Sequence, residues 1–194
     1  MDEAIEKFKA IVIANCARPD FAYREWFVEY HLNIVERIAL ELCDRYVEAD
    51  RDLVRTLVWF HDFGKPLDEA NERRTTLEQG PKCMTECGFS VEFIAKTLEY
   101  WQLMEQKETI DLRTAPIEVQ IVSSADGASH FTGTFYAGYF ADGEPFSETQ
   151  QQLREKIEKD WQRKIVLPEL KESFKGRYIQ AKELLGEFPE HFIN

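Results

Sequence analysis

The chain has 194 residues, of which 44% are hydrophobic and 31% are charged, and these values predict one soluble globular domain over residues 1–194. Its formal net charge of −12 argues against a nucleic-acid polymer as a partner, because such binding needs a basic stripe. No apolar run approaches the ~18 residues of a membrane span and the first residues are acidic, so we expect no membrane partner and a cytoplasmic location.

The first third of the sequence predicts three amphipathic helices. Residues 2–16 form the first, since their apolar side chains recur with helical spacing. The second runs from about 22 to 47 and carries His31 on its apolar face. The third runs from Arg51 to Phe60, and its apolar face leads directly to the pair His61-Asp62.

The middle of the chain alternates polar and apolar stretches. The polar stretch 68–76 predicts a loop. A short helix is expected over 81–88, between a proline that opens it and a glycine that closes it. A longer helix follows from Val91 to about Met104, and Pro116 stands near the start of the helix that carries Asp126.

The last third of the chain begins with a segment of different composition. His130 to Pro145 holds five aromatic residues and three glycines without regular alternation, which predicts an irregular segment. The aromatic residues of 131–140 could form a wall or lid over a pocket, or pack as a connector between helices. Ser147 to Gln150 has the form of a capping box at the start of a helical hairpin over about 147–187. The apolar stripes of this hairpin should pack on the core or on a second copy of the chain, so a homo-oligomer is one of two alternatives.

Four side chains with metal-binding chemistry lie on these apolar helix faces. His31 precedes the adjacent pair His61-Asp62, and Asp126 follows the pair on a separate helix. Burying an ionisable side chain costs free energy unless the side chain is paired or bound to a metal ion. Imidazole and carboxylate are both ligands of first-row metals, so this ordered set indicates a metal site.

The ordered set resembles the metal-binding signature of the HD-domain superfamily of metal-dependent phosphohydrolases. His61-Asp-Phe-Gly-Lys65 is similar to that family's HD-x-G-K motif, and Ala125-Asp-Gly-Ala-Ser-His130 is similar to its final-Asp helix. The resemblance covers about residues 24–131 and implies an all-α fold, a single helical HD-type domain with an added C-terminal helix pair. It also implies hydrolysis of a phosphate ester, either a nucleotide or another small phosphorylated molecule.

The resemblance implies that His31, His61, Asp62 and Asp126 hold the metal ion. Many members carry two further histidines between the HD pair and the final Asp, and these hold a second ion. This chain has four histidines, and none lies between residues 61 and 130. We therefore expect a mononuclear phosphomonoesterase with one divalent transition metal ion, for which the mixed nitrogen and oxygen ligands leave Mn, Fe, Co, Ni and Zn open.

Three residues have expected roles in the reaction. The family's matching lysine lies near the substrate phosphate, so Lys65 is expected to bind the phosphate as a point charge. His130 stands one helical turn beyond Asp126 and could donate a proton to the leaving group, hold a phosphate oxygen or orient a ligand; a surface histidine is the alternative. Asp62, beside its role as a ligand, could help to remove a proton from the attacking water.

Other polar residues leave alternatives open. Arg73 and Arg74 could reach an anion from their loop or could be a solvated pair, and Glu72 is a further candidate base. Cys83 and Cys87 lie four residues apart, but no second pair completes a zinc site, so we expect reduced thiols. The competing function is a sensor module that holds its metal ion and a ligand without turnover. A purely structural helical protein would require the four ligand-type residues to fall into register by accident.

Overall fold

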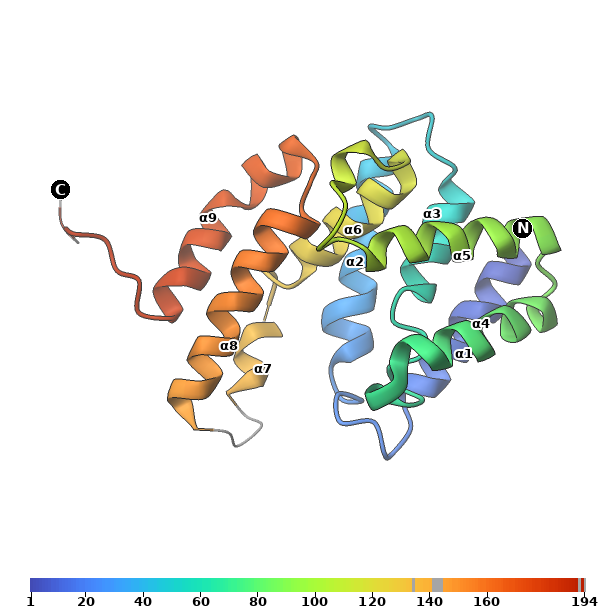
Figure 1. Ribbon diagram of the computed structural model, residues 1–194, viewed down its shortest axis with the longest axis horizontal. Coiled ribbons are helices and arrows are strands. Elements are labelled where there is room, and N and C mark those ends of the chain that lie inside the picture. Colours follow the sequence, from blue (N-terminus) through green and yellow to red (C-terminus); the bar gives the residue numbers. More distant parts are fainter. Residues whose placement is uncertain (134, 141–144, 192, 194) are drawn as a thin grey trace.

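The computed structural model describes residues 1–133, 135–140, 145–191 and 193, and every regular element in these ranges is helical (Figure 1). The prediction of an all-α fold is therefore confirmed. The α-helices of the described residues are α1 (Asp2–Cys16), α2 (Asn33–Cys43), α3 (Arg51–Phe60), α4 (Glu72–Cys87), α5 (Val91–Glu105), α6 (Ile117–Ser129), α7 (Phe135–Tyr139), α8 (Phe146–Lys159) and α9 (Pro168–Leu184). Shorter turns connect some of them: the π-helical turns η1 (Val28–Leu32) and η4 (Asp160–Lys164), and the 3-10 turns η2 (Glu69–Asn71) and η3 (Leu112–Thr114).

Helices α2, α3 and α6 pack on one another at the centre of the molecule, with α1, α4 and α5 on one side and α8 and α9 on the other (Figure 1). Helix α6 is buried along almost its whole length. Its residues 123–129 are mainly Ser, Ala and Gly, and such small side chains let neighbouring helices approach closely. Asp126 therefore lies where several helices meet.

Several helix ends agree with the local sequence signals. Helix α1 has the predicted bounds, and α5 ends one residue beyond the prediction. Gly88 ends α4 with a φ of +95°, which glycine adopts without strain. Pro168 occupies the first turn of α9, where its missing N–H costs no helical hydrogen bond.

Three local predictions are wrong. The helix predicted over 22–47 begins later, since residues 22–26 form turns and η1 precedes α2. Pro81 lies inside α4 instead of opening a helix. The capping box predicted at 147–150 does not form, because α8 has no side-chain cap at its start. In each case the packing of the surrounding helices overrides the local sequence signal.

The prediction of a loop over 68–76 is also wrong, because η2 and the first turn of α4 occupy this stretch. A tertiary contact explains the difference. The Thr76 hydroxyl donates a hydrogen bond of 2.9 Å to the Glu72 carbonyl and accepts one of 3.0 Å from the Gly64 N–H. A Cβ on Gly64 would overlap with the Glu72 carbonyl, so glycine is needed for this approach. The start of α4 is thereby held against the turn that follows His61-Asp62.

The C-terminal helices pack on the core, which is one of the two arrangements predicted for them. The Ser123 hydroxyl donates a hydrogen bond of 3.1 Å to the Lys164 carbonyl, and Ser124 Oγ accepts one of 3.0 Å from the Val166 N–H. The apolar stripe of α8 and η4 is buried, as predicted: Leu153, Ile157, Trp161 and Ile165. Among the described residues, no helix is long and apolar enough to cross a membrane.

Candidate metal centre

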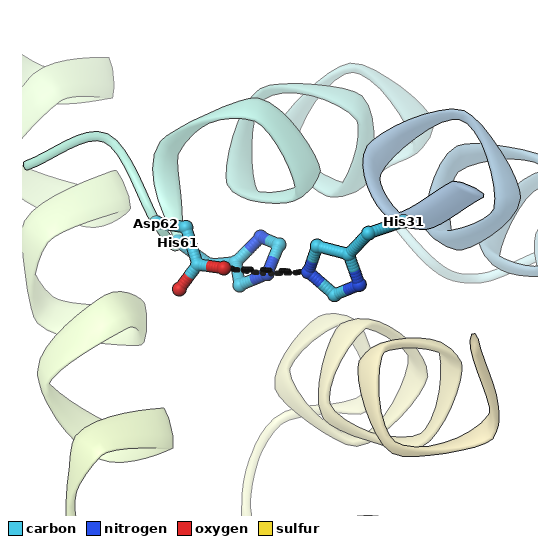
Figure 2. Close-up of side chains that lie close together, drawn as sticks. All are labelled: His31, His61 and Asp62. Atoms are coloured by element: carbon cyan, nitrogen blue, oxygen red, sulfur yellow. Dashed lines mark hydrogen bonds and ion pairs between the residues drawn. The ribbon is translucent and has the colours of Figure 1, made fainter. Parts of the chain in front are cut away.

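His31 and the adjacent residues His61 and Asp62 lie close together, with the His31 ring facing the other two side chains (Figure 2). His31 lies on η1, and the pair His61-Asp62 follows directly after the end of α3. The His31 Nε2 atom is 3.3 Å from His61 Nε2 and 3.3 Å from Asp62 Oδ2, and His61 Nε2 is 3.4 Å from Asp62 Oδ2. Both imidazoles are buried, so these atoms face one another away from bulk solvent.

Helix α6 brings two more ligand-type side chains to the same place. Asp126 Oδ1 is 3.9 Å from the Nε2 atoms of both His31 and His61. His130, one turn further along, has its Nε2 atom 3.3 Å from Asp126 Oδ1. His130 is 4% exposed, so the surface-histidine alternative is excluded. The four residues predicted as ligands are thus brought together, and His130 joins them as a fifth candidate.

Hydrogen bonds made by the Nδ1 atoms, which point away from the cluster, define the tautomers of His31 and His61. His61 Nδ1 is 2.7 Å from the Val58 carbonyl, which can only accept, so Nδ1 carries the proton. The Ser129 hydroxyl donates its one proton to the Asp126 carbonyl at 2.7 Å, so it accepts from His31 Nδ1 at 2.9 Å. In both rings the Nε2 atom is left with its lone pair directed into the cluster.

His130 follows the same pattern. Its Nδ1 atom donates to Asp160 Oδ2 at 2.7 Å, so its Nε2 atom also presents a lone pair to the cluster. Burial, together with the charge of Lys156, lowers the pKa of His130 to about 3. Burial also lowers the pKa of His31, so both rings are neutral at pH 7. The neutral rings of His31 and His130 therefore direct unprotonated nitrogens toward two carboxylates, and the Nε2 atom of His61 faces the same carboxylates.

The two carboxylates are ionised. Burial by itself would raise the pKa of Asp62, but the charge of Lys65, the largest of the opposing effects, holds it well below its usual range. Burial acts in the same direction on Asp126, and there the charge of Lys164 is the largest of the opposing effects that hold the pKa well below its usual range. The cluster is thus composed of hydrogen-bond acceptors, and a cation is the group that satisfies it.

The spacing of these atoms fits a bound metal ion. If each ligand lies about 2.1 Å from a first-row metal, neighbouring ligand atoms are about 3.0 Å apart in an octahedron and about 3.4 Å apart in a tetrahedron. The separations among His31 Nε2, His61 Nε2 and Asp62 Oδ2, 3.3, 3.3 and 3.4 Å, lie in this range. Asp126 Oδ1, at 3.9 Å from both imidazoles, lies a few tenths of an ångström outside it.

The C-terminal segment α8–η4 supplies charged residues that sequence reasoning missed. Lys164 Nζ is 2.6 Å from Asp126 Oδ2 and 3.6 Å from Asp160 Oδ1. Asp160 is fully buried, and Lys156 Nζ lies 3.2 Å from its Oδ2 atom. Burial would raise the pKa of Asp160, but His130, Lys164 and Lys156 hold it far below its usual range. The available signal was the spacing of Lys156, Asp160 and Lys164, which alternate in charge at intervals of four residues beside an apolar stripe.

Gly127 permits this segment to reach Asp126, one of the residues predicted as metal ligands. A Cβ on Gly127 would lie 2.8 Å from Lys164 Cβ and 3.0 Å from Ile165 Cγ1. Both distances are shorter than a normal contact between side-chain carbons. The glycine next to Asp126 therefore lets η4 pack against α6 closely enough for Lys164 to pair with Asp126.

A pocket of about 490 Å³ opens beside Asp62. Its basic lining residues are Lys65, Arg73, Arg74, Lys107, Lys156, Lys159 and Lys164. Its acidic lining residues are Asp62, Glu69, Glu72 and Glu105. Basic residues thus outnumber acidic ones by three in the lining, although the whole chain has a net charge of −12. This basic pocket is a local site for an anion.

Three of the four predicted substrate-binding residues, Lys65, Arg73 and Arg74, line the basic pocket at different depths, whereas His130 is not among its lining residues. Lys65 Nζ is 3.8 Å from Asp62 Oδ2, and its side chain is 28% exposed. Arg73 and Arg74 are exposed and lie on the first turn of α4, where they form the outer wall of the pocket. Glu72 is hydrogen-bonded to Asp62, and burial together with the Asp62 charge raises the pKa of Glu72 to about 8.

Comparison with known proteins adds no further assignment. No family model, curated protein or solved structure matches this chain. The functional interpretation therefore depends on the chemistry of the described site and on the motif resemblance given above.

Proposed function

We propose that this chain is a metal-dependent phosphohydrolase of the HD-domain type that acts on a nucleotide or another small phosphate ester. The observation that carries the proposal is the junction of two features at Asp62. On one side of this residue lies a cluster of acceptor atoms that suits a divalent cation. On the other side lies a pocket with an excess of basic groups in a strongly acidic chain.

The ligand set suits one divalent transition metal ion among Mn, Fe, Co, Ni and Zn. His31, His61, Asp62 and Asp126 would hold the ion, and His130 Nε2 is available as a fifth donor. When bound, such an ion supplies Lewis acidity for the phosphoryl group and lowers the pKa of a coordinated water.

The side chains of the basic pocket would bind and orient the phosphoryl group. Lys65 extends beside Asp62 and would offset negative charge on the non-bridging oxygens. Lys156 lines the same pocket and would contact the anion from α8. Glu72 is hydrogen-bonded to Asp62 within the pocket, and its pKa of about 8 leaves most of it protonated at pH 7, so only its ionised fraction can accept a proton from an attacking water.

The geometry favours a different role for His130 from the proton donor suggested by the sequence. Its Nδ1 proton is engaged by Asp160, and its Nε2 atom carries a lone pair next to Asp126. A ring in this tautomer acts as a metal ligand and has no proton to give on the site-facing side.

The volume of the basic pocket, about 490 Å³, suits a small molecule, which agrees with the expectation that the substrate is not a polymer.

The experiment that tests the proposal measures metal content and phosphate release on the same samples. The protein is stripped with EDTA, reloaded separately with each of the five metals, and assayed against a panel of phosphomonoesters. We expect about one metal ion per chain and metal-dependent release of phosphate. Asp126→Asn should lose both, whereas Asp52→Asn on the first turn of α3 serves as the matched control and should retain both.

A second variant separates binding of the ion from binding of the phosphate. Lys65→Ala should keep the metal ion and lower kcat/KM about 10- to 100-fold, the usual effect of losing a charged hydrogen bond. If the wild-type protein binds its metal ion but releases phosphate from none of the esters, the sensor function replaces the enzyme. If it binds no metal ion, the assignment of the cluster itself is wrong.

A further inference from the structure

A second and smaller pocket adjoins the basic pocket. It has a volume of about 100 Å³, and the basic pocket and this one both include Lys65 and Glu69 in their walls. Most of its remaining wall is aromatic, and we call it the aromatic pocket: Tyr23, Trp26, Phe27, Phe135 and Tyr139. The aromatic segment that follows His130 thus contributes two of the rings, which agrees with the predicted wall over a pocket.

The rings of the aromatic pocket stand at steep angles to one another. The centroids of Trp26 and Phe135 are 5.5 Å apart with an interplanar angle of 89°, and those of Tyr23 and Trp26 are 5.4 Å apart at 57°. Trp26 is only partly buried, whereas Phe27 and Phe135 are 2% and 6% exposed. The rings therefore form the walls and floor of a recess, instead of filling it as a stack.

The aromatic pocket is in contact with the metal centre. The Phe135 ring stacks on His130 with centroids 3.9 Å apart, and the Phe27 centroid is 5.0 Å from that of His31. Lys65 Nζ lies 5.5 Å from the Phe27 centroid and 3.8 Å from Asp62 Oδ2. One ligand could therefore place an anionic group at Lys65 and a flat apolar group between the aromatic walls.

Size and charge limit what the aromatic pocket can hold. A cavity of about 150 Å³ accommodates a benzene molecule, so a volume of about 100 Å³ with a partly open mouth suits one six-membered ring and is too small for two fused rings. Aromatic walls also bind quaternary ammonium groups. Here the Lys65 ammonium forms part of the wall, and its positive charge disfavours a permanent cation.

We propose that the aromatic pocket binds the single planar ring of the substrate, so that the substrate class is a phosphomonoester carrying one six-membered aromatic ring, as in a pyrimidine nucleotide or an aryl phosphate. This inference rests on the proposed phosphohydrolase function for the phosphate end of the ligand. The ring would stack on Trp26, the largest of the partly exposed rings in the wall, while the phosphate lies in the basic pocket.

The test compares ligands that differ only in the ring. Uridine 5′-monophosphate, adenosine 5′-monophosphate and ribose 5-phosphate are titrated by calorimetry into the metal-depleted full chain, which cannot turn them over by the proposed reaction. We expect uridine 5′-monophosphate to bind about 5- to 100-fold more tightly than ribose 5-phosphate, the range for stacking one base on one aromatic side chain. Adenosine 5′-monophosphate should bind less tightly than the uridine nucleotide.

Variants assign the preference to the pocket. Trp26→Ala should remove the advantage of the uridine nucleotide and leave the affinity for ribose 5-phosphate within about twofold, whereas Trp26→Phe should retain most of it. Tyr30→Ala, which removes a partly exposed aromatic ring outside the pocket, is the matched control and should change neither affinity. Thermal unfolding of each variant verifies that it is folded.

The outcomes distinguish this inference from the proposed function. Equal affinities for the uridine nucleotide and ribose 5-phosphate, or a preference that survives in Trp26→Ala, would overturn the ring site. Phosphocholine is titrated as a ligand with a permanent cation. If it or adenosine 5′-monophosphate binds more tightly than uridine 5′-monophosphate, the assigned ligand class is overturned. A ring preference in a protein that hydrolyses no ester with any metal would support the ring site and reject the enzyme. Phenyl phosphate, titrated in parallel, separates an aryl phosphate from a nucleotide, and either result supports a one-ring ligand.

Discussion

Replacing Lys164 with methionine is expected to destabilise the metal-free protein strongly. Lys164 Nζ lies 2.6 Å from Asp126 Oδ2 and 3.6 Å from Asp160 Oδ1, and its side chain is 11% exposed. Methionine fills a similar volume with an apolar side chain. The substitution therefore removes the positive charge and leaves two buried carboxylates with Lys156 as the remaining close ammonium group of Asp160.

The expected loss of stability follows from the burial of the ion pair between Lys164 and Asp126. Removing one partner of a buried ion pair typically costs about 3–5 kcal/mol, because the remaining charge stays desolvated and unpaired. In a domain of this size each kcal/mol corresponds to about 2–4 °C in Tm, so we expect Tm to fall by about 6–20 °C. A bound divalent cation next to Asp126 would replace the lost charge, so the destabilisation should be smaller in the metal-loaded protein.

The assay is urea and thermal unfolding in EDTA, repeated after metal is added. Lys159→Met is the matched control, because Lys159 is the last residue of α8, directly before η4, and lines the same pocket but is exposed, so its loss should change stability by no more than about 0.5 kcal/mol. The double variant Lys164→Met/Asp126→Asn should be less destabilised than the sum of its single variants. A Lys164→Met protein as stable as Lys159→Met in EDTA would refute the inference that this buried ion pair holds η4 on α6.

Two further predictions concern the same contact between η4 and α6. Gly127→Ala should destabilise the protein by about 1–3 kcal/mol in urea unfolding, because the new Cβ would lie 2.8 Å from Lys164 Cβ. Gly176→Ala in α9, where a Cβ meets no atom within 4 Å, should be neutral or stabilising by up to about 1 kcal/mol, and an equal loss in both variants would count against the close-packing argument. Deletion of residues 147–194 should expose the buried side of α6 and cause aggregation, measured by size-exclusion chromatography; a soluble monomer with unchanged Tm would contradict it.

The sequence by itself was sufficient for the features that depend on local spacing. Helical spacing of apolar residues predicted α1, α3 and α5, and the end of α4 follows from Gly88. The four ligand-type residues could also be identified from the sequence, because each stands at an apolar helical stretch where an ionisable group needs a partner. Each of these signals is formed by residues within a few positions of the one concerned, and none depends on which helices later meet.

The features decided by the tertiary structure are those that join distant parts of the chain. The role of His130 depends on the hydrogen bond from its Nδ1 atom to Asp160, thirty residues further on. The ion pair of Asp126 with Lys164 requires the close approach that Gly127 permits. No local pattern indicates such a pairing, because amphipathic helices with similar stripes can pack on a core in several registers. The register adopted here brings lysines of the C-terminal segment to the candidate metal centre, and this gives an acidic chain a basic pocket.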